Sequence, residues 1–168
     1  MRDFLLTMGG VIISLLLVAL AGIALFGGFN TGKASNLVTA ITLIESNARA
    51  GFAQSSQGYV NFTTANVGTL ASGGGGMFPP NMVKNGVLTD DWGNAMQLAS
   101  ANNGSQGVIT FGGGGSQDVD QCTTFVTNHK DYVSLTVGSR TFTQTNQPDA
   151  FTAKGACQGS PTIAVTFQ

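Results

Sequence analysis

Residues 1–29 of the chain read MRDFLLTMGGVIISLLLVALAGIALFGGF, with no charged side chain after the third position. As an α-helix, the uncharged part of this run would be ~39 Å long, enough to cross the hydrocarbon core of a bilayer. A secretory signal is the alternative, because the triplet ALA at residues 19–21 resembles a small-residue cleavage site. The run is longer than such a signal, and Arg2 is followed at once by Asp3, which leaves only a weakly basic start. We therefore expect a retained apolar helix.

The next stretch, NTGKASNLVTAITLIESNARAGFAQ at residues 30–54, has a one-sided pattern. Its apolar residues recur at steps of three and four, as in an amphipathic helix; they are Ala34, Leu37, Val38, Ile41, Ile44, Ala48 and Phe52. The polar residues on the opposite side are Thr39, Thr42, Glu45, Ser46 and Arg49. Glu45 and Arg49 stand four residues apart, a spacing that predicts a weakly favourable ion pair. We expect an apolar helix over 1–29 and a head over 30–168, whose own helix covers 31–54.

The composition of the chain points to a protein that works outside the cytoplasm. Charged residues make up 9% of the 168 residues, against about 25% in an average soluble protein. The net charge is −1 and no basic cluster occurs, which argues against binding of nucleic acid. The two cysteines, Cys122 and Cys157, predict one disulfide, with two buried free thiols as the alternative. Such a bond would stabilise the fold by roughly 3–4 kcal/mol in the chain-entropy model.

After residue 58 the pattern changes to short runs rich in β-branched and aromatic residues, which predict strands. These runs are YVNF (59–62), AMQLA (95–99), GVITF (107–111), YVSLTVG (132–138) and TIAVTF (162–167). Gly-rich segments between them predict loops. Residues 116–130 predict a short helix with Asp118 as N-cap and with Cys122, Phe125 and Val126 buried. The expected fold is α+β: a long N-terminal helix on a mostly antiparallel sheet, with the short helix tied to the last strand by the disulfide.

No motif in the sequence predicts catalysis, a metal site or a cofactor. The segment GGFNTGKAS, from Gly27 to Ser35, departs from a phosphate-binding loop because Ala34 follows the lysine and no strand precedes it. His129 is the only histidine, so neither a triad nor a histidine metal site can be assembled. We expect the negative charges of Asp118 and Asp120 to stabilise the start of the short helix rather than to bind calcium. Asp90 and Asp91 predict a turn, with weak cation binding as the alternative.

Several segments, taken in order, resemble type IV pilins of the type IVb branch, which includes the toxin-coregulated pilin and the thin-pilus pilins of conjugative plasmids. One or two charged residues precede a long apolar helix that contains Gly22, and an amphipathic helical half follows. The segment DDWGNAMQLA resembles the loop-to-strand entry NPWGG of the plasmid pilins through Trp92 and Gly93. The segments VDQCTTFV and ACQGSPTIAVTF resemble the two cysteine segments of the family. The resemblance covers essentially the whole chain.

This resemblance implies a structural role and a particular N-terminus. It implies a major pilus subunit that waits in the bacterial inner membrane and then polymerises with copies of itself into an extracellular filament for conjugation or adhesion. Its partners would be the pilus assembly machinery and a prepilin peptidase, which would leave an N-methylated Met1. The family glutamate is replaced by Leu5 in this chain, and we expect Asp3 to take over its contact with the amine of a neighbouring subunit. The alternative is that Arg2 and Asp3 lie at the lipid headgroups or neutralise each other.

Small residues along the apolar run have two expected roles. Residues that let helices approach closely in a filament core are Gly9, Gly10, Ser14, Ala19 and Gly22. Residues at which the helix is expected to lose hydrogen bonds and stretch are Gly22, Gly27 and Gly28. Two other functions remain open on the sequence: a pseudopilin of a type II secretion system, and a membrane-anchored extracytoplasmic binding domain that forms no polymer.

Overall fold

The computed structural model describes residues 32–72 and 76–168, and residues 33–168 form one compact unit. The chain enters this unit as an α-helix over 32–48, which continues as a π-helical turn, η1 (Arg49–Ala53). The predicted amphipathic helix is therefore confirmed over the described residues, and it ends at Ala53 rather than at residue 54. The apolar face is completely buried at Ala34, Leu37, Ile41, Ile44 and Ala48. Val38 and Phe52, at the margins of that face, are only partly covered.

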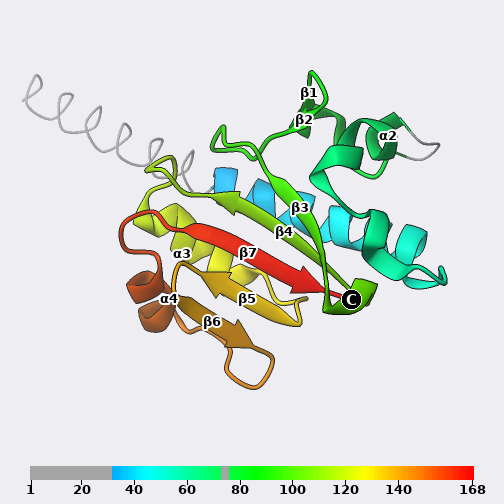
Figure 1. Cartoon of the computed structure of the whole chain (residues 1–168). Helices are drawn as coiled ribbons and strands as arrows, with labels where there is room; N and C mark the ends of the chain where they lie inside the picture. Colours follow the sequence, from blue (N-terminus) through cyan, green and yellow to red (C-terminus); the bar gives the residue numbers. More distant parts are fainter. Residues whose placement is uncertain (1–31, 73–75) are drawn as a thin grey trace, which may run out of the picture. The chain divides into compact units, whose positions relative to one another are not determined.

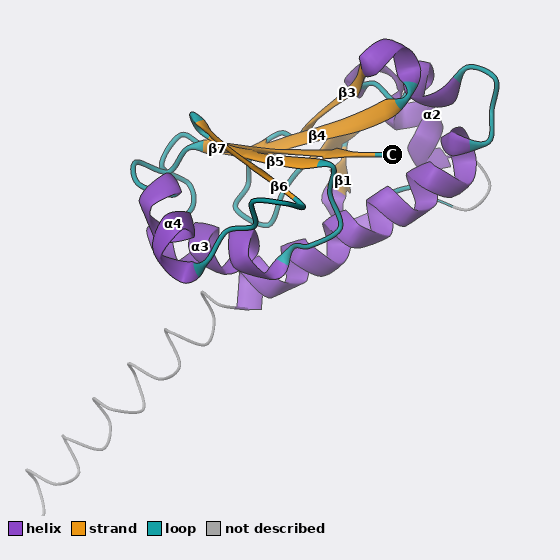
Figure 2. Cartoon of the chain, turned by 90° about the horizontal axis from the view of Figure 1, so that it is seen from below, coloured by secondary structure: helices purple, strands orange, loops and turns teal. Residues whose placement is uncertain are grey.

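One face of a five-stranded antiparallel sheet covers this helix (Figure 2). The strands, in spatial order, are β3 (Gln97–Ala101), β4 (Gln106–Gly112), β7 (Thr162–Phe167), β5 (Ser134–Val137) and β6 (Arg140–Thr143). Four of them lie within or overlap the predicted strands, whereas β6 was not predicted. Residues alternate between buried and partly exposed along β4 and β7, as expected for a sheet with one covered face.

The last strand, β7, lies in the middle of the sheet (Figure 1). It pairs with β4 on one side, where Ile109 faces Val165, and with β5 on the other, where Leu135 also faces Val165. Only glycine fits at position 107 of β4, because the ring of Phe167 occupies the space of a side chain there. A Cβ added to Gly107 would lie 2.6 Å from that ring. The strand β7 thus joins two separate hairpins into one sheet.

The predicted strand at 59–62 is wrong, because these residues form a short 3-10 helix, η2 (Gly58–Asn61). Gly58 has a φ of 53°, a conformation that favours glycine and turns the chain before the strand can begin. The spacing of three between Tyr59 and Phe62 then places both rings in the core. There they pack edge to face against Phe167, with ring centroids 5.4 and 5.6 Å away. The aromatic content that suggested a strand instead serves a helical turn.

The segment between η2 and β3 contains small elements that the sequence pattern did not predict. They are η3 (Thr64–Asn66), α2 (Val67–Ser72), η4 (Pro80–Met82), β1 (Val83–Lys84) and β2 (Val87–Leu88). β1 and β2 form a separate two-stranded hairpin. Its turn consists of Asn85 and Gly86, with φ of 52° and 77°, as in the favoured two-residue hairpin turn.

Two short helices, α3 (Val119–Asn128) and α4 (Ala150–Ala156), pack together beside the sheet (Figure 1). Asp118 caps α3 as predicted, since its carboxylate accepts a hydrogen bond from the backbone N–H of Gln121. The predicted disulfide joins Cys122 to Cys157, with a Cα–Cα distance of 5.7 Å. The bond links α3 to the C-cap of α4 rather than directly to the last strand. The sequence pattern did not predict α4, which comes before β7. Within the described residues, no helix combines the length and apolarity that crossing a bilayer requires.

Replacing both cysteines by serine is expected to lower the free energy of unfolding by about 3–4 kcal/mol, because the unfolded chain loses a covalent loop of 35-residue separation. Urea unfolding of the full chain, kept soluble with a mild detergent, would measure this loss. Reduction of the wild-type chain with dithiothreitol serves as a control and should shift the midpoint equally. An unchanged midpoint in both cases would contradict the stabilising role of the bond.

Candidate functional site

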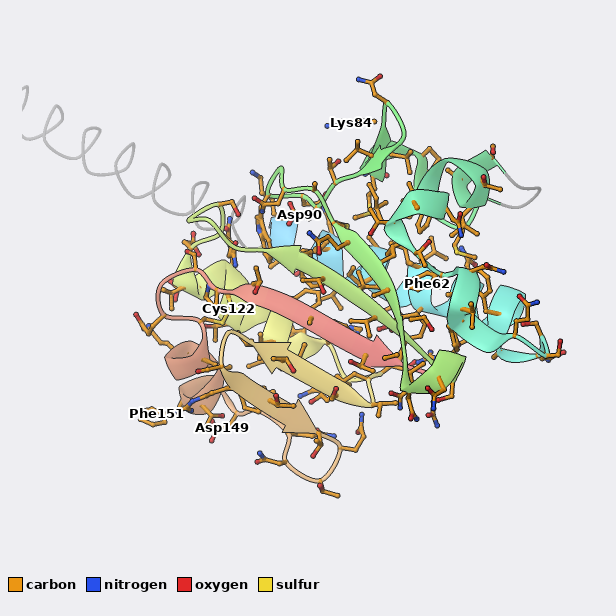
Figure 3. All side chains as sticks on the ribbon, viewed as in Figure 1. Phe62, Lys84, Asp90, Cys122, Asp149 and Phe151 are labelled. Atoms are coloured by element: carbon orange, nitrogen blue, oxygen red, sulfur yellow. A yellow bond between two sulfur atoms is a disulfide. The ribbon has the colours of Figure 1, made fainter. Side chains whose placement is uncertain are left out.

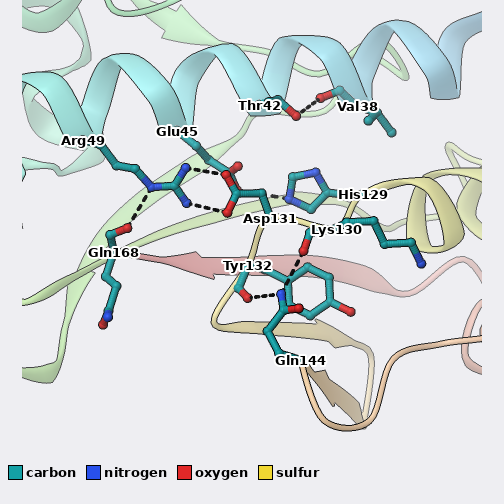
Figure 4. A network of polar contacts seen from close by, with 10 residues as sticks. All are labelled: Val38, Thr42, Glu45, Arg49, His129, Lys130, Asp131, Tyr132, Gln144 and Gln168. Atoms are coloured by element: carbon teal, nitrogen blue, oxygen red, sulfur yellow. Dashed lines mark hydrogen bonds and ion pairs between the residues drawn. The ribbon is translucent and has the colours of Figure 1, made fainter.

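The helix that leads into the head is fixed to it by a buried contact between a carboxyl group and an imidazole ring. Oε1 of Glu45 lies 3.1 Å from Nε2 of His129, and the two side chains are 0% and 1% exposed. His129 is the C-cap of α3, and its ring stacks on those of Phe125 and Tyr132, with centroids 5.3 and 6.0 Å away. Figure 4 shows His129 with Glu45 and Tyr132. The pair therefore connects the middle of the helix to the end of α3. A carboxylate and two aromatic rings around it make His129 a structural histidine.

Burial controls the charge of Glu45. Desolvation raises the pKa of this carboxyl above its ordinary value of 4.5, while the hydrogen bond and charge of His129 act in the opposite direction. The positive charge of Arg49 lowers the same pKa and the negative charge of Asp131 raises it. Desolvation prevails, because Oε2 of Glu45 is buried and accepts no hydrogen bond.

Arg49, one turn further along the helix, forms a second connection (Figure 4). Its Nη1 donates to Oδ2 of Asp131 at 2.6 Å and its Nη2 to Oδ1 at 3.2 Å. Its Nε donates to the backbone oxygen of Gln168 at 2.8 Å, and the guanidinium lies 5.6 Å from the ring centroid of Phe167. Arg49 thus binds the segment after α3 and the end of β7 at once.

The predicted weak pairing of Glu45 with Arg49 acts through charge alone, since the positive charge of Arg49 lowers the pKa of Glu45, but the placement of Glu45 on the polar side is wrong. Glu45 faces the core and binds His129, while Arg49 donates its side-chain hydrogen bonds to Asp131 and Gln168. Tertiary partners fix each side chain with better geometry than an exposed pair of neighbours would have.

The turn predicted at Asp90 and Asp91 is confirmed, and the first carboxylate organises it. Asp90 is 5% exposed, and its Oδ1 accepts hydrogen bonds from the backbone N–H groups of Trp92 and Asn94 at 3.0 and 2.8 Å. Its Oδ2 accepts from the N–H of Gly112 at 2.9 Å. These donors occupy the oxygens that a cation would need, and the described residues contain no group of three or more possible metal ligands.

The Gly-rich segment between β4 and α3 is held at a second point by Gln117. Its Oε1 accepts from the N–H of Gly113 at 2.8 Å, and its Nε2 donates to the oxygen of Pro161 at 2.7 Å. All four glycines from 112 to 115 have a φ between 64° and 93°, in the left-handed region. Their role is to allow this turn, which agrees with the predicted loop.

The far end of the helix borders an open surface hollow of about 400 Å³. The lining residues, called the hollow below, are Ala53, Ser55, Ser56, Gln57, Gly58, Tyr59, Asn103, Gly104, Ser105 and Gln168. No acidic or basic side chain is among them. Gly58 and Gly104 face each other so closely that a Cβ on Gly58 would lie 2.2 Å from the oxygen of Gly104. Backbone therefore forms part of its floor.

The candidate residues of the apolar run lie outside the described part of the chain. They are Met1, Asp3, Gly9, Gly10, Ser14, Ala19, Gly22, Gly27 and Gly28, and their roles stay predictions. Sequence reasoning missed the pair of Glu45 and His129. Two spacings could have indicated it: Glu45 stands four residues after Ile41 on the apolar face, and His129 stands four after the buried Phe125.

Comparison with known proteins gives the class of fold. No protein-family profile matches the chain, and no curated protein sequence matches it either. Among solved structures, the chain is similar to the crystal structure of a type IVb pilin from Salmonella typhi, with a TM-score of 0.53 and 15% sequence identity. The match covers 80% of this chain and 97% of that chain. The chain thus has the fold of a type IVb pilin, and the resemblance drawn from the sequence is confirmed at this level.

The variant E45Q is expected to gain stability relative to wild type as the pH rises from 4 to 8. The folded state raises the pKa of Glu45 above its ordinary value of 4.5. The stability that comes from protonation of the buried carboxyl is therefore complete below pH 4.5, and it is lost as the pH rises through the pKa of the folded state. Urea unfolding of both chains at pH 4, 6 and 8 would measure the difference. The variant D120N, which changes an exposed carboxylate of α3 that is not among the charges acting on the pKa of Glu45, is the control. A difference between E45Q and wild type that stays constant with pH would refute the raised pKa.

The variant D90A is expected to lose about 2–3 kcal/mol of unfolding free energy, because three backbone N–H groups lose a charged acceptor in a buried turn. The neighbouring variant D91A is the matched control, since Asp91 is less buried and should lose less than about 0.5 kcal/mol. Thermal unfolding monitored by circular dichroism compares the two. Equal losses would contradict the organising role of Asp90.

Proposed function

We propose that this chain is the major structural subunit of a type IVb-like pilus, which polymerises through its apolar residues 1–29 into an extracellular filament. The observation that carries the proposal is the combination of two features in one chain. A head with the fold of a type IVb pilin contains an amphipathic helix that the structure describes from residue 32 onward. The sequence immediately before that helix is uncharged from residue 4 to residue 29.

An apolar segment of this length suits both a membrane and a filament core. In either setting its surface must be covered on all sides, by lipid or by copies of the same helix. Transfer from the inner membrane to the filament therefore exchanges one apolar neighbour for another. The hydrophobic contribution to the free energy of this transfer nearly cancels. Close packing then decides association, which favours small residues such as Gly9, Gly10 and Ser14. The glycines at 22, 27 and 28 would let the segment lengthen during assembly.

The head contributes a firm attachment for the helix. Five completely buried apolar residues lie along 32–48, and the hydrogen bonds of the Glu45 and Arg49 side chains add polar connections. A force that pulls on the helix is therefore passed to α3 and to the central strand. This supports a role as a load-bearing subunit, because separating helix from sheet would expose the whole core at once.

The N-terminus would carry the remaining features of assembly. A prepilin peptidase would leave Met1 as the first residue with a methylated amine, and the pilus assembly machinery would add subunits at the inner membrane. The carboxylate of Asp3 would pair with that amine on a neighbouring subunit, which offsets the cost of about 2.5–3.5 kcal/mol for a charge within the membrane. The finished filament would serve conjugation or adhesion outside the cell.

Electron microscopy of material sheared from cells that make the chain tests this function. Thin filaments are expected, with this chain as their main subunit and an N-methylated Met1 detected by mass spectrometry. A chain that starts at Gly22, without filaments, would identify residues 1–21 as a signal peptide and overturn the proposal.

The variant D3N is expected to abolish most filaments, because a neutral side chain leaves the neighbouring amine without its partner. The variant D3E keeps the charge and should assemble, and R2Q tests whether the adjacent cation matters. Counting filaments per cell by electron microscopy compares the three. Assembly of D3N at the wild-type level would remove Asp3 from the mechanism.

A further inference from the structure

The hollow at the end of the helix is lined by neutral polar groups. Three serine hydroxyls and three side-chain amides surround it, and its residues include no acidic or basic side chain. Its volume of about 400 Å³ lies near the lower end of the range of about 300–1,000 Å³ that is typical of small-ligand sites. An ion would find no side chain of opposite charge in this lining, and an apolar ligand would find little apolar surface. The lining therefore favours a small ligand that is neutral and polar.

Charged side chains of the head lie away from the hollow or are already paired. Figure 3 shows Lys84, Asp90 and Asp149, all of them away from the C-terminal end of β7, where the hollow lies. Arg49 lies at that end of β7, but its guanidinium is paired with both carboxylate oxygens of Asp131. These side chains therefore do not give the hollow a preference for a charged ligand.

The polar side chains of the hollow can both donate and accept hydrogen bonds. The hydroxyl of Ser55 donates to a backbone oxygen at 3.3 Å and that of Ser105 donates to another at 2.8 Å, so each keeps its lone pairs as acceptors. The side chains of Ser56 and Asn103 make no hydrogen bond with any described residue. A sugar hydroxyl also donates and accepts, so it matches a lining of this kind.

Tyr59 adds a buried polar group to the wall of the hollow. The residue is 1% exposed, and its hydroxyl is buried without a hydrogen-bond partner among the described residues. A buried hydroxyl without a partner costs free energy that a hydrogen bond would recover. A ligand hydroxyl that reached this group would gain more than the same contact gains at an exposed surface.

Close backbone contact holds the two walls of the hollow in place. One wall is η2 and the other is the turn between β3 and β4, η5 (Asn102–Gly104). A Cβ on Gly104 would lie 3.0 Å from the backbone oxygen of Gln57, so the two walls leave no space for a side chain at this position. The hollow is thus largely preformed, and a ligand would lose little affinity to ordering of the backbone.

An extended peptide suits this region less well than a glycan. Peptides bind by adding a strand to a free sheet edge or by placing apolar side chains in pockets. The outer edge of β3 is occupied at Leu98, whose N–H donates to Oγ1 of Thr64 at 2.8 Å and whose oxygen accepts from it at 3.1 Å. A neutral glycan requires neither a free edge nor an apolar pocket.

We propose that the hollow binds a short neutral glycan, whose hydroxyls exchange hydrogen bonds with the serine and amide side chains of the lining. Because the ring of Tyr59 is buried and cannot stack on a sugar, a single hollow binds such a glycan weakly. In the proposed filament the hollow recurs on every subunit, so many weak contacts to one glycan-bearing surface act together. Only this last step rests on the proposed function.

Nuclear magnetic resonance of the ¹⁵N-labelled full chain tests the binding, in a mild detergent that has no sugar headgroup. Lactose and N,N′-diacetylchitobiose are the probes, and each titration measures a dissociation constant. At least one of them is expected to shift the amide signals of residues 53–59 and 102–105 to saturation. The variant S56W, which fills the hollow, should abolish these shifts, whereas S139W places the same ring on the exposed turn between β5 and β6 and should not.

The variant N103G removes one amide of the lining and keeps the backbone, because Asn103 has a φ of 54° that glycine adopts readily. It should weaken binding at least about threefold, as expected for the loss of one hydrogen bond. N85G is the matched control, since Asn85 has a φ of 52° but lies in the β1–β2 turn, and it should leave binding unchanged.

Three results would each overturn the glycan site. They are the absence of saturable shifts with both disaccharides, shifts that S56W and N103G leave unchanged, and stronger binding of glucuronate or triglycine than of either disaccharide. The measurement needs no filaments, so each of these results would leave the proposed function standing. Binding of a disaccharide by a chain that forms no filaments would support the site and overturn the proposed function alone.

Discussion

Burial of one stripe of the helix 32–48 against the sheet is the constraint on which the rest of the head depends. The helix offers Ala34, Leu37, Ile41, Ile44 and Ala48 to a single face, and the alternating residues of β4 and β7 provide the other side. A single helix and a single sheet each have an apolar face that water would otherwise cover, so neither is stable alone.

Polar groups complete this packing at the positions where apolar contact alone would not fix the helix. A stripe of alanine, leucine and isoleucine tolerates small slides along its axis. The contact of Glu45 with His129 and the two hydrogen bonds of Arg49 to Asp131 do not tolerate such slides. These hydrogen bonds weaken when donor and acceptor move apart by a few tenths of an ångström. Their cost is the burial of a carboxylate with one unpartnered oxygen. Polar contacts also fix the backbone at Asp90, where one buried carboxylate determines the shape of a loop that has little apolar content.

The sequence predicts the parts of this fold that depend on local periodicity or on chemistry. The helix follows from a period of 3.6, the cap at Asp118 from a short side chain before an apolar stripe, and the disulfide from an even cysteine count. Elements that depend on distant contacts were missed. Residues 59–62 have strand-forming side chains, yet Gly58 and the ring of Phe167 turn them into a helical cluster. Glu45 reads as a surface residue until His129, 84 positions later, is placed beside it. α4, at seven residues with an internal glycine, carries too weak a period to be recognised.

The central position of β7 also determines the order in which the head can be made. The strands before it form two hairpins, β3 with β4 and β5 with β6, which share no hydrogen-bonded edge until residues 162–167 come between them. During synthesis, the core side chains of both hairpins and of the helix therefore stay exposed to water until residues 162–167 have been made. Assembly of the sheet is a single late event with long-range contacts, which folds slowly and exposes open strand edges meanwhile. Until β7 is in place, pairing with the open edge of another copy competes with correct assembly of the sheet.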